Sequence, residues 1–413
     1  MKCGPTFDCT QNFWQLASIA GVGFGLPAMV VGGQLAQKYG AGTALLSILI
    51  ANLFLWTLGL GIISMAYKRK HAIENVREYL GKNTSIIAAL LWIVSFLTWY
   101  AIQLQGIADI TNQLMPNIAS WKVGIFWGAL VACLGLGGFF SLKHICVFSL
   151  PLLLGYVIYA ICTHSSVQFS GTWGVSLPGI IAALIVWLPG IINLPTLSRH
   201  SSSQAQSILG LSFMMFFHVI LQIFTIFIGI HSPTELLLPY LHNASMNIAL
   251  FSAFSFAILA YICINLLNIY LASVAWETAI SRIHDCKEYL IVGLLGTVLY
   301  LCAIPSSLNI QLLEVIMTSF MASLGVVLSI NFLIRIVVRH RPRPWERLAS
   351  SLCWLIGCLA SFAIQVQLPN ETRYAFEHIK GPLFGILASA FAFLILLFIE
   401  ETIWSLKHLP KKM

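Results

Sequence analysis

Charged residues are scarce in this sequence, and their scarcity excludes an ordinary soluble protein. Asp, Glu, Lys and Arg make up 9% of the 413 residues, and hydrophobic residues make up 59%, whereas about 25% of the residues of a soluble domain are charged. No long polar block separates the apolar runs, so there is no room for a second, soluble domain. We therefore predict a single all-α polytopic membrane domain over residues 1–413.

The chain also lacks the motifs that would indicate an enzyme or a pump. It contains no zinc-binding His-Glu-x-x-His, no Gly-x-Ser-x-Gly nucleophile turn and no phosphate-binding loop that ends in Gly-Lys-Ser or Gly-Lys-Thr. Its ten cysteines are scattered, without the paired spacing of a zinc site. We expect no enzyme, no catalytic residues, no metal and no cofactor, and a driving force that comes from an ion or substrate gradient.

Two further absences concern how the chain crosses the membrane. The alternation of apolar and polar residues over about ten positions that marks the strands of a membrane β-barrel is missing. The first residues show no short apolar stretch followed by a small-residue cleavage site, so we expect the first span to remain in the protein.

Long apolar runs recur along the chain instead. A membrane-spanning helix needs about 20 mainly apolar residues, and on this basis we predict about twelve spans. Their approximate ranges are 14–37, 42–66, 85–110, 123–141, 145–163, 177–198, 207–230, 245–275, 288–305, 309–337, 348–367 and 380–405.

The distribution of Lys and Arg predicts the orientation of these spans. With both termini in the cytoplasm, the outer side keeps only Lys38, Lys122, Arg373 and Lys380 out of 22 Lys and Arg residues, as the positive-inside rule requires. We expect a multi-pass cell-membrane protein with cytoplasmic N- and C-termini. The basic segment 339–347 then faces anionic lipid headgroups, which explains its charge without a nucleic-acid partner.

Glycine and proline fall near the centres of two predicted spans. The first span contains Gly25 and Pro27 in a glycine-rich stretch, and the sixth contains Pro189 and Pro195. Because glycine frees the backbone and proline removes a hydrogen-bond donor, we predict a break in both helices. Irregular backbone at that depth has to line a cavity, and paired breaks are typical of secondary transporters with inverted repeats. Proline kinks in an ordinary helix bundle are the alternative.

Polar side chains at membrane depth are the candidates for a binding site. On a helix, Trp99 and Gln103 share a face because they lie four residues apart. An indole beside a carboxamide suits a planar heteroaromatic ligand, and Trp187 supplies a second face for an aromatic sandwich. The alternative is that Trp99 packs in the bundle and Gln103 bonds a neighbouring helix. We expect Gln105, which points elsewhere, to bond between helices.

The later spans add further polar groups. Asn265 and Asn268 lie on adjacent positions of one helix face, where they either bond across helices or face a site. We expect His218 to be a satisfied buried imidazole. Asp109 lies near the outer end of its span, so we expect a solvated carboxylate, with a proton-carrying role as the alternative.

Three stretches together resemble the nucleobase:cation symporter-1 family, in particular its cytosine permease branch. Residues 29–52 are similar to the family's first two helices, with Gly-Gly-x-Leu, a small-residue turn and then an Asn. The segment Trp-Tyr-Ala-Ile-Gln at 99–103 resembles the third-helix pattern Trp-Phe-Gly-x-Gln. The segment 187–200 resembles the sixth-helix pattern of a Trp and then Asn-x-Pro-Asp-Phe-Thr/Ser-Arg, with Thr196 in place of the acid. The order and spacing of the three stretches carry the resemblance.

The resemblance implies a fold and a set of site residues. The fold is the five-plus-five inverted repeat of the APC superfamily, which is leucine-transporter-like and works by alternating access. Its first repeat is expected in 1–163, its second in 177–338, and two extra helices in 348–405. The substrate-binding residues that it implies are Trp99, Gln103, Trp187, Asn193, Asn265 and Asn268.

The sequence departs from the family at the sodium site. The family binds sodium through carbonyls at the first-helix break, here near Gly25, and through an eighth-helix Ala followed by Ser and Thr. Ala260 matches, but Cys263 and Ile264 replace the two hydroxyls. A thiol and an alkyl group are poor ligands for a hard cation. The coupling ion, Na⁺ or H⁺, is therefore left open, as is facilitated exchange.

We therefore expect a secondary transporter that imports a nucleobase such as cytosine, or a similar planar heterocycle. An amino-acid permease of the same superfamily is the alternative within transport, and a polytopic membrane enzyme or receptor is the alternative outside it. The expected partners are the small substrate and the lipid bilayer, with a monomeric chain. The sequence does not choose among cytosine, purines, hydantoins and other rings.

Overall fold

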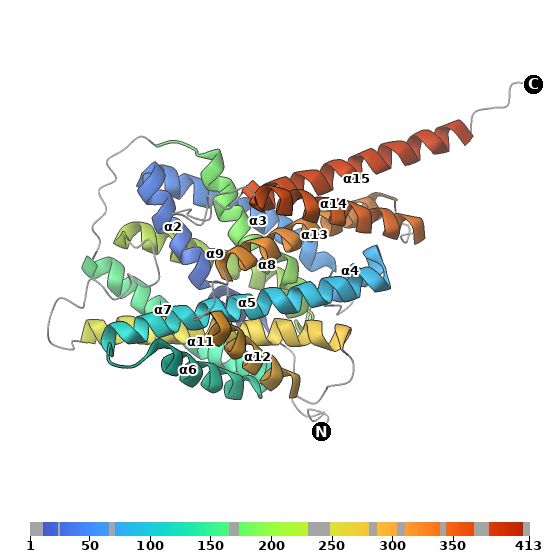
Figure 1. Ribbon diagram of the computed structural model, residues 1–413. Helices are drawn as coiled ribbons and strands as arrows, with labels where there is room; N and C mark the ends of the chain where they lie inside the picture. The colour runs from blue at the N-terminus through green and yellow to red at the C-terminus, as the bar shows by residue number, and fades with distance from the viewer. Residues whose placement is uncertain are drawn as a thin grey trace, which may run out of the picture.

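The part of the chain that the structure describes is almost entirely helical (Figure 1). This computed structural model describes residues 11–23, 25–65, 71–164, 173–229, 248–280, 287–303, 310–338, 344–366 and 380–407. The helices are α1 (Phe13–Gly23), α2 (Gly25–Tyr39), α3 (Ala41–Met65), α4 (Ala72–Leu80), α5 (Lys82–Leu114), α6 (Ser120–Gly135), α7 (Gly138–His164), α8 (Leu177–Ser198), α9 (Gln204–Ile228), α11 (Ile248–Ala279), α12 (Lys287–Ala303), α13 (Ile310–Val338), α14 (Pro344–Val366) and α15 (Lys380–Lys407).

Every predicted span corresponds to a helix or, for the first span, to α1 and α2 together. Within the described residues, nine helices are long and apolar enough to cross a membrane by length and composition, and the shorter α6 is also apolar. The predicted all-α polytopic class is therefore confirmed. Apolar runs of this length form helices because lipid offers no partner for an exposed peptide group, so each span has to satisfy its own backbone.

One helix was not predicted from the sequence. α4 is a nine-residue helix in which Ile73, Val76 and Leu80 are buried, while Glu74 and Arg77 are exposed. It is amphipathic and too short to cross a membrane. Its buried face packs against α5, α8 and α14.

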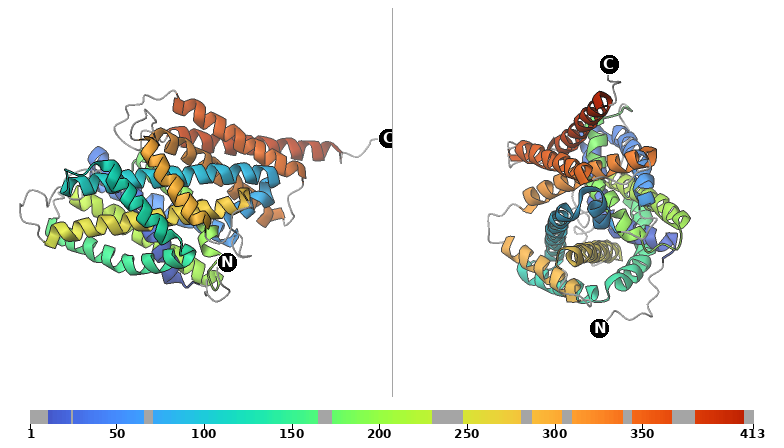
Figure 2. Two further views of the ribbon diagram at one scale, coloured as in Figure 1. Left: turned by 60° about the horizontal axis from the view of Figure 1, so that its bottom comes forward. Right: turned by 90° about the vertical axis from the view of Figure 1, so that its right-hand side faces the viewer.

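The helices pack into two groups, and the contacts within each group are more extensive than the direct contacts between the groups. α1, α2, α3, α8 and α9 pack on one another, and α5, α6, α11 and α12 form the second group. α5 and α11 lie side by side across the molecule and run in opposite directions (Figures 1 and 2). α1 and α7 make most of the contacts that join the two groups.

Small residues allow the closest of these helix contacts. A Cβ atom at Gly32 would lie 1.9 Å from the backbone oxygen of Gln222, so α2 and α9 approach each other backbone to backbone there. A Cβ atom at Gly106 would lie 2.3 Å from the hydroxyl oxygen of Tyr261, which joins α5 to α11. Close approach at small residues is the usual basis of helix association in lipid.

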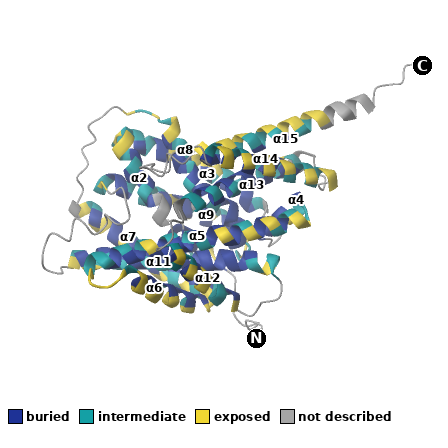
Figure 3. Ribbon diagram, in the orientation of Figure 1, coloured by how far each residue is buried: buried dark blue, intermediate teal, exposed yellow. Residues whose placement is uncertain are grey.

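The outer surface is apolar, as a lipid-facing surface requires. Large hydrophobic side chains such as Phe148, Phe391 and Phe398 are 68%, 67% and 72% exposed. α14 and α15 lie at the edge of the bundle, and their outer faces carry many exposed residues, whereas α11 is largely buried (Figure 3).

Candidate functional site

The centre of the molecule contains three carboxamides on the facing helices α5 and α11. The two helices are antiparallel, and Gly106 of α5 lies against Tyr261 of α11. Gln103 lies one turn before Gly106 on α5, and Asn265 lies one turn after Tyr261 on α11. Gln103 and Asn265 therefore lie at the same level along the two helices. Asn268 follows one turn later on the same face. The predicted polar residues of the third and eighth spans therefore share one interface.

These carboxamides are buried without the partners that burial normally requires. Asn265 has no exposed surface, and neither its Oδ1 nor its Nδ2 forms a hydrogen bond with a described residue. Asn268 is 6% exposed, and its Nδ2 also lacks a partner within the described part of the chain. A buried carboxamide without hydrogen-bond partners costs about 1–3 kcal/mol of folding stability. A polar ligand that bonds to these carboxamides would remove that cost.

Gln103 belongs to the same group. Its side chain is 6% exposed, and among the described residues it has no hydrogen-bond partner. The expected alternative, in which Gln103 bonds a neighbouring helix, is not realised there. Gln105 was expected to bond between helices, and this prediction is wrong: its Nε2 donates to Asp109 Oδ1 of its own helix at 2.7 Å, near the outer surface.

Trp187 is stacked against a histidine. Its ring centroid lies 3.4 Å from that of His218, with an angle of 24° between the planes. Both side chains are buried, and His218 Nε2 lies 3.3 Å from the backbone oxygen of Ala20. His218 therefore links α9 to α1 and covers one face of Trp187.

The predicted aromatic sandwich stays a prediction. Trp99 is half-buried on α5 and makes no ring contact with another described residue. His218 was expected to be a satisfied buried imidazole. It is buried and its Nε2 has the Ala20 carbonyl as partner, but its Nδ1 has no hydrogen-bond partner among the described residues. Its stacking on Trp187 was not foreseen, because the contact joins residues of two different helices.

The predicted break in the sixth span is wrong. α8 is helical from Leu177 to Ser198, with Pro189 and Pro195 inside the helix. Each proline removes only one backbone donor, and the surrounding turns keep the helix continuous. Asn193, a predicted substrate residue, donates from Nδ2 to the Pro189 carbonyl at 2.9 Å. This amide donor therefore bonds within its own helix.

The predicted break in the first span falls at the edge of what is described. α1 ends at Gly23 and α2 begins at Gly25, and the residue between them lies outside the described residues. The neighbouring glycines also have a packing role. A Cβ atom at Gly21 would meet Phe217 at 3.2 Å, and one at Gly23 would meet Leu267 at 2.4 Å.

The residues at the predicted cation site do not fit a hard cation. Ala260 lines a small cavity of about 20 Å³ together with Gly21 and Val22, and the cavity is enclosed by apolar side chains. Cys263 is fully buried next to Cys146 of α7. The side chains that this site offers therefore lack the oxygen ligands that sodium requires.

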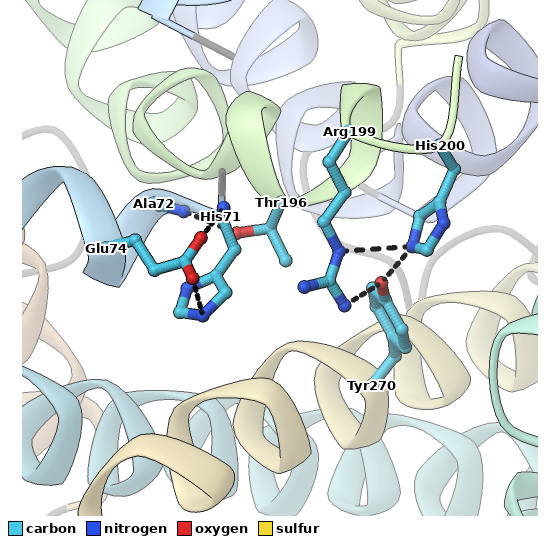
Figure 4. Close-up of polar contacts among 7 residues, drawn as sticks. All are labelled: His71, Ala72, Glu74, Thr196, Arg199, His200 and Tyr270. Carbon is cyan, nitrogen blue, oxygen red and sulfur yellow. Dashed lines mark hydrogen bonds and ion pairs between the residues drawn. The ribbon is translucent and has the colours of Figure 1, made fainter. Parts of the chain in front are cut away.

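A polar cluster joins the two helix groups at the end of α8 (Figure 4). Arg199 Nη2 donates to the hydroxyl of Tyr270 on α11 at 3.2 Å, and His200 Nε2 lies 2.9 Å from the same hydroxyl. The His200 ring stacks on Phe139 of α7 at a centroid distance of 4.1 Å. Arg199 matches the Arg that ends the sixth-helix pattern, but the sequence does not predict its contact with Tyr270.

The same end of α8 also holds α4 and the start of the described chain. The backbone N–H of Ala72 donates to Thr196 Oγ1 at 3.1 Å. Residue Gln11 forms a bridge to the segment after α8, with its N–H donating to the His200 oxygen at 2.9 Å. α11, α4 and the segment at Gln11 therefore all form hydrogen bonds with the C-terminal end of α8 and the residues that follow it.

His71 lies directly before α4 in this cluster. Its backbone N–H donates to Glu74 Oε2 at 2.9 Å, and its Nε2 lies 3.8 Å from Glu74 Oε1. Burial lowers the pKa of His71 to about 4, against the opposing effect of Glu74 and with a further lowering by the Arg199 guanidinium. The imidazole is therefore neutral when α4 is docked at neutral pH.

Comparisons with solved structures identify the fold. No family model and no curated protein matches the chain by sequence. The chain is similar to Mhp1, a nucleobase-cation-symport-1 family transporter, in a closed conformation with bromovinylhydantoin bound, with a TM-score of 0.69 and 16% identity over 96% of this chain and 93% of that chain. It is also similar to a Na⁺-coupled sialic acid symporter in a substrate-bound outward-open state, with a TM-score of 0.65 and 13% identity over 93% and 89% of the two chains.

A third similar structure is a mutant of the Eremococcus coleocola manganese transporter, with a TM-score of 0.62 and 14% identity over 94% of both chains. The three proteins act on unrelated solutes, so the likeness concerns the fold. The chain has the leucine-transporter-like fold of multi-pass membrane proteins, with five-plus-five helices and two additional C-terminal helices.

Proposed function

We propose that this protein is a secondary transporter for a nucleobase or a similar planar heterocycle. The observation that carries the proposal is the Asn265 carboxamide, which is fully buried at the centre of the fold with both polar atoms unbonded among the described residues. A carboxamide offers an adjacent donor and acceptor, which match the edge of a ring that has a carbonyl or ring nitrogen beside an N–H.

The surroundings of Asn265 support a flat ligand. Gln103 adds a second carboxamide from α5, and in this proposal the indoles of Trp99 and Trp187 stack on the ligand. Buried aromatic rings stack with planar rings of any base, and carboxamides select the edge. Mhp1, which has the same fold, was solved with a hydantoin derivative bound, and a hydantoin has such an edge.

The architecture supports alternating access as the transport mode. We infer that residues 1–163 and 177–338 form the two repeats and that 348–405 form the added helices. The two packed helix groups move relative to each other in this proposal, and the Arg199–Tyr270 contact holds their cytoplasmic ends together in the conformation described. Cytoplasmic N- and C-termini remain part of the proposal, because they rest on the positive-inside rule.

The side chains at the expected sodium site indicate which ion drives transport. Since Ala260 and Cys263 supply no side-chain oxygen, we infer that transport does not depend on sodium held at that position and that it is proton-coupled or runs as exchange. A steep rise of uptake with a sodium gradient, together with indifference to pH, would contradict this inference.

Ligand binding is the first test. The purified protein should gain thermal stability with one or more of cytosine, uracil, purines and hydantoins, and proteoliposomes should take up the radiolabelled hit chemically unchanged. Stabilisation by aromatic amino acids alone would favour an amino-acid permease, and a chemically altered product would indicate an enzyme.

The role of Trp99 can be tested with the same ligand. Trp99→Ala should weaken binding by about 1–3 kcal/mol if the indole stacks on the ring in the ligand-bound state. Trp121→Ala is the matched control, because Trp121 is 48% exposed on α6. Isothermal titration of both folded variants measures the effect, and unchanged affinity of Trp99→Ala would reject the sandwich.

A further inference from the structure

A membrane-facing groove lies between α5, α13 and α14, away from the central site. Its volume is about 460 Å³. Its lining is apolar except at one end, where Thr84 and Ser351 share a hydrogen bond of 2.9 Å. Leu355 and Leu359 of α14 border it and are 51% and 59% exposed, so the groove is open at the side of the bundle.

The position of the groove limits what can fill it. α5 and α14 are both long and apolar enough to span a membrane, and the exposed side chains along the groove are hydrocarbon. At this depth the surrounding medium is lipid, and an apolar hollow in contact with lipid tails is filled by a tail. The Thr84–Ser351 end lies near the N-termini of α5 and α14, where the chain leaves the apolar region.

A basic residue stands at that end. Arg347 lies one helical turn before Ser351 on α14, so it shares the face that borders the groove. Its Nε atom is buried and has no hydrogen-bond partner among the described residues. Arg339, Arg341 and Arg343 precede α14 in the sequence. A phosphate would satisfy the Arg347 guanidinium with charge-assisted hydrogen bonds.

We propose that this groove is a binding site for an anionic phospholipid of the cytoplasmic leaflet. One acyl chain lies along Leu352, Leu355 and Leu359, and the headgroup phosphate is bound by Arg347. The site joins α5, which carries Trp99 and Gln103, to the added helix α14. It depends on lipid binding alone and stands whether or not the protein carries nucleobases.

Native mass spectrometry of the detergent-purified protein with added lipid tests the site. Phosphatidylglycerol and phosphatidylcholine with the same acyl chains are the two probes. We expect the full-length protein to bind phosphatidylglycerol about fivefold more tightly than phosphatidylcholine, because one basic residue near an anionic headgroup contributes about 1 kcal/mol to binding. Arg347→Gln should remove this preference, and Lys380→Gln, which removes a charge at the start of α15, should keep it.

A second pair of variants tests the acyl chain. Leu355→Trp fills the groove and should reduce the retention of both lipids, whereas Leu387→Trp on α15, at a residue that is 55% exposed and does not line the groove, should not. Equal binding of the two lipids by the unmodified protein overturns the proposal. The proposal is also overturned if the protein is a dimer that Leu355→Trp dissociates, because the groove would then be an interface between two copies of the chain.

Discussion

Asn265 shows how one residue can be costly for stability and useful for binding. Asn265→Leu keeps the approximate size of the side chain but removes both unbonded polar atoms. We expect the unliganded variant to be more stable by about 1–3 kcal/mol, because the buried penalty disappears, and to lose its stabilisation by ligand. Thermal unfolding with and without the best nucleobase measures both effects.

Asn331 provides the matched control at the same scale. It is also a buried carboxamide, but its Nδ2 donates to the Val327 carbonyl at 2.8 Å and lies 3.1 Å from Ser350 Oγ. Asn331→Leu should therefore lower the melting temperature. If Asn265→Leu lowers the melting temperature by a similar amount, Asn265 has a partner within the protein and is not available to bind a ligand.

At the scale of helix pairs, Gly32 determines how closely α2 can approach α9. Gly32→Ala places a Cβ atom 1.9 Å from the Gln222 backbone oxygen, and neither backbone can move without separating the helices. We expect a loss of about 1–3 kcal/mol, typical of overpacking, seen as a lower melting temperature. Gly155→Ala on α7 has no atom within 4 Å of the added carbon and should be neutral or slightly stabilising.

The docking of α4 predicts a pH dependence. Because burial lowers the pKa of His71 from 6.5 to about 4, the unfolded chain takes up a proton between these values that the folded protein does not. The free energy of unfolding therefore falls as the pH drops from about 6.5 to about 4, by on the order of 3 kcal/mol. Above pH 6.5 this contribution is constant.

His71→Asn isolates that contribution from the other histidines. Thermal unfolding between pH 4.5 and 7.5 should show a shallower loss of stability in the variant than in the unmodified protein. Parallel curves for the two proteins would show that His71 takes up its proton in the folded state as readily as in the unfolded chain.

For the whole molecule, the Tyr270 hydroxyl is the contact that holds the end of α8 to the opposite helix group. Tyr270→Phe removes the acceptor of Arg199 and the partner of His200, and it keeps the ring beside Phe139. We expect amide hydrogen exchange in residues 196–203 to become about tenfold faster, which corresponds to the loss of about 1.4 kcal/mol.

Tyr159→Phe on the outer face of α7, where the side chain is 41% exposed, is the control for this experiment and should leave the exchange unchanged. Exchange in α3 should be unaffected by either variant. If Tyr270→Phe leaves residues 196–203 as protected as before, the end of α8 is held by other contacts, such as those of Gln11 and Thr196.

The sequence by itself determined the spans and the class of fold. Apolar length is a local property, and in lipid it predicts a helix without knowledge of the neighbours, so all twelve predicted ranges contain helices. Three segments that resemble one transporter family were sufficient to predict the leucine-transporter-like fold. α4 was missed because a short amphipathic helix gives no such signal.

Only the tertiary structure decided which polar atoms have partners. The contacts of His218 and Tyr270 join helices that are far apart in the sequence, and their geometry depends on how whole helices pack. The same packing leaves the polar atoms of Asn265 without partners among the described residues. The prolines of α8 illustrate the same limit: each removes one donor, but the packed helix stays continuous. Local composition predicts where the chain can cross the membrane, and packing between helices decides which buried groups are left for a ligand.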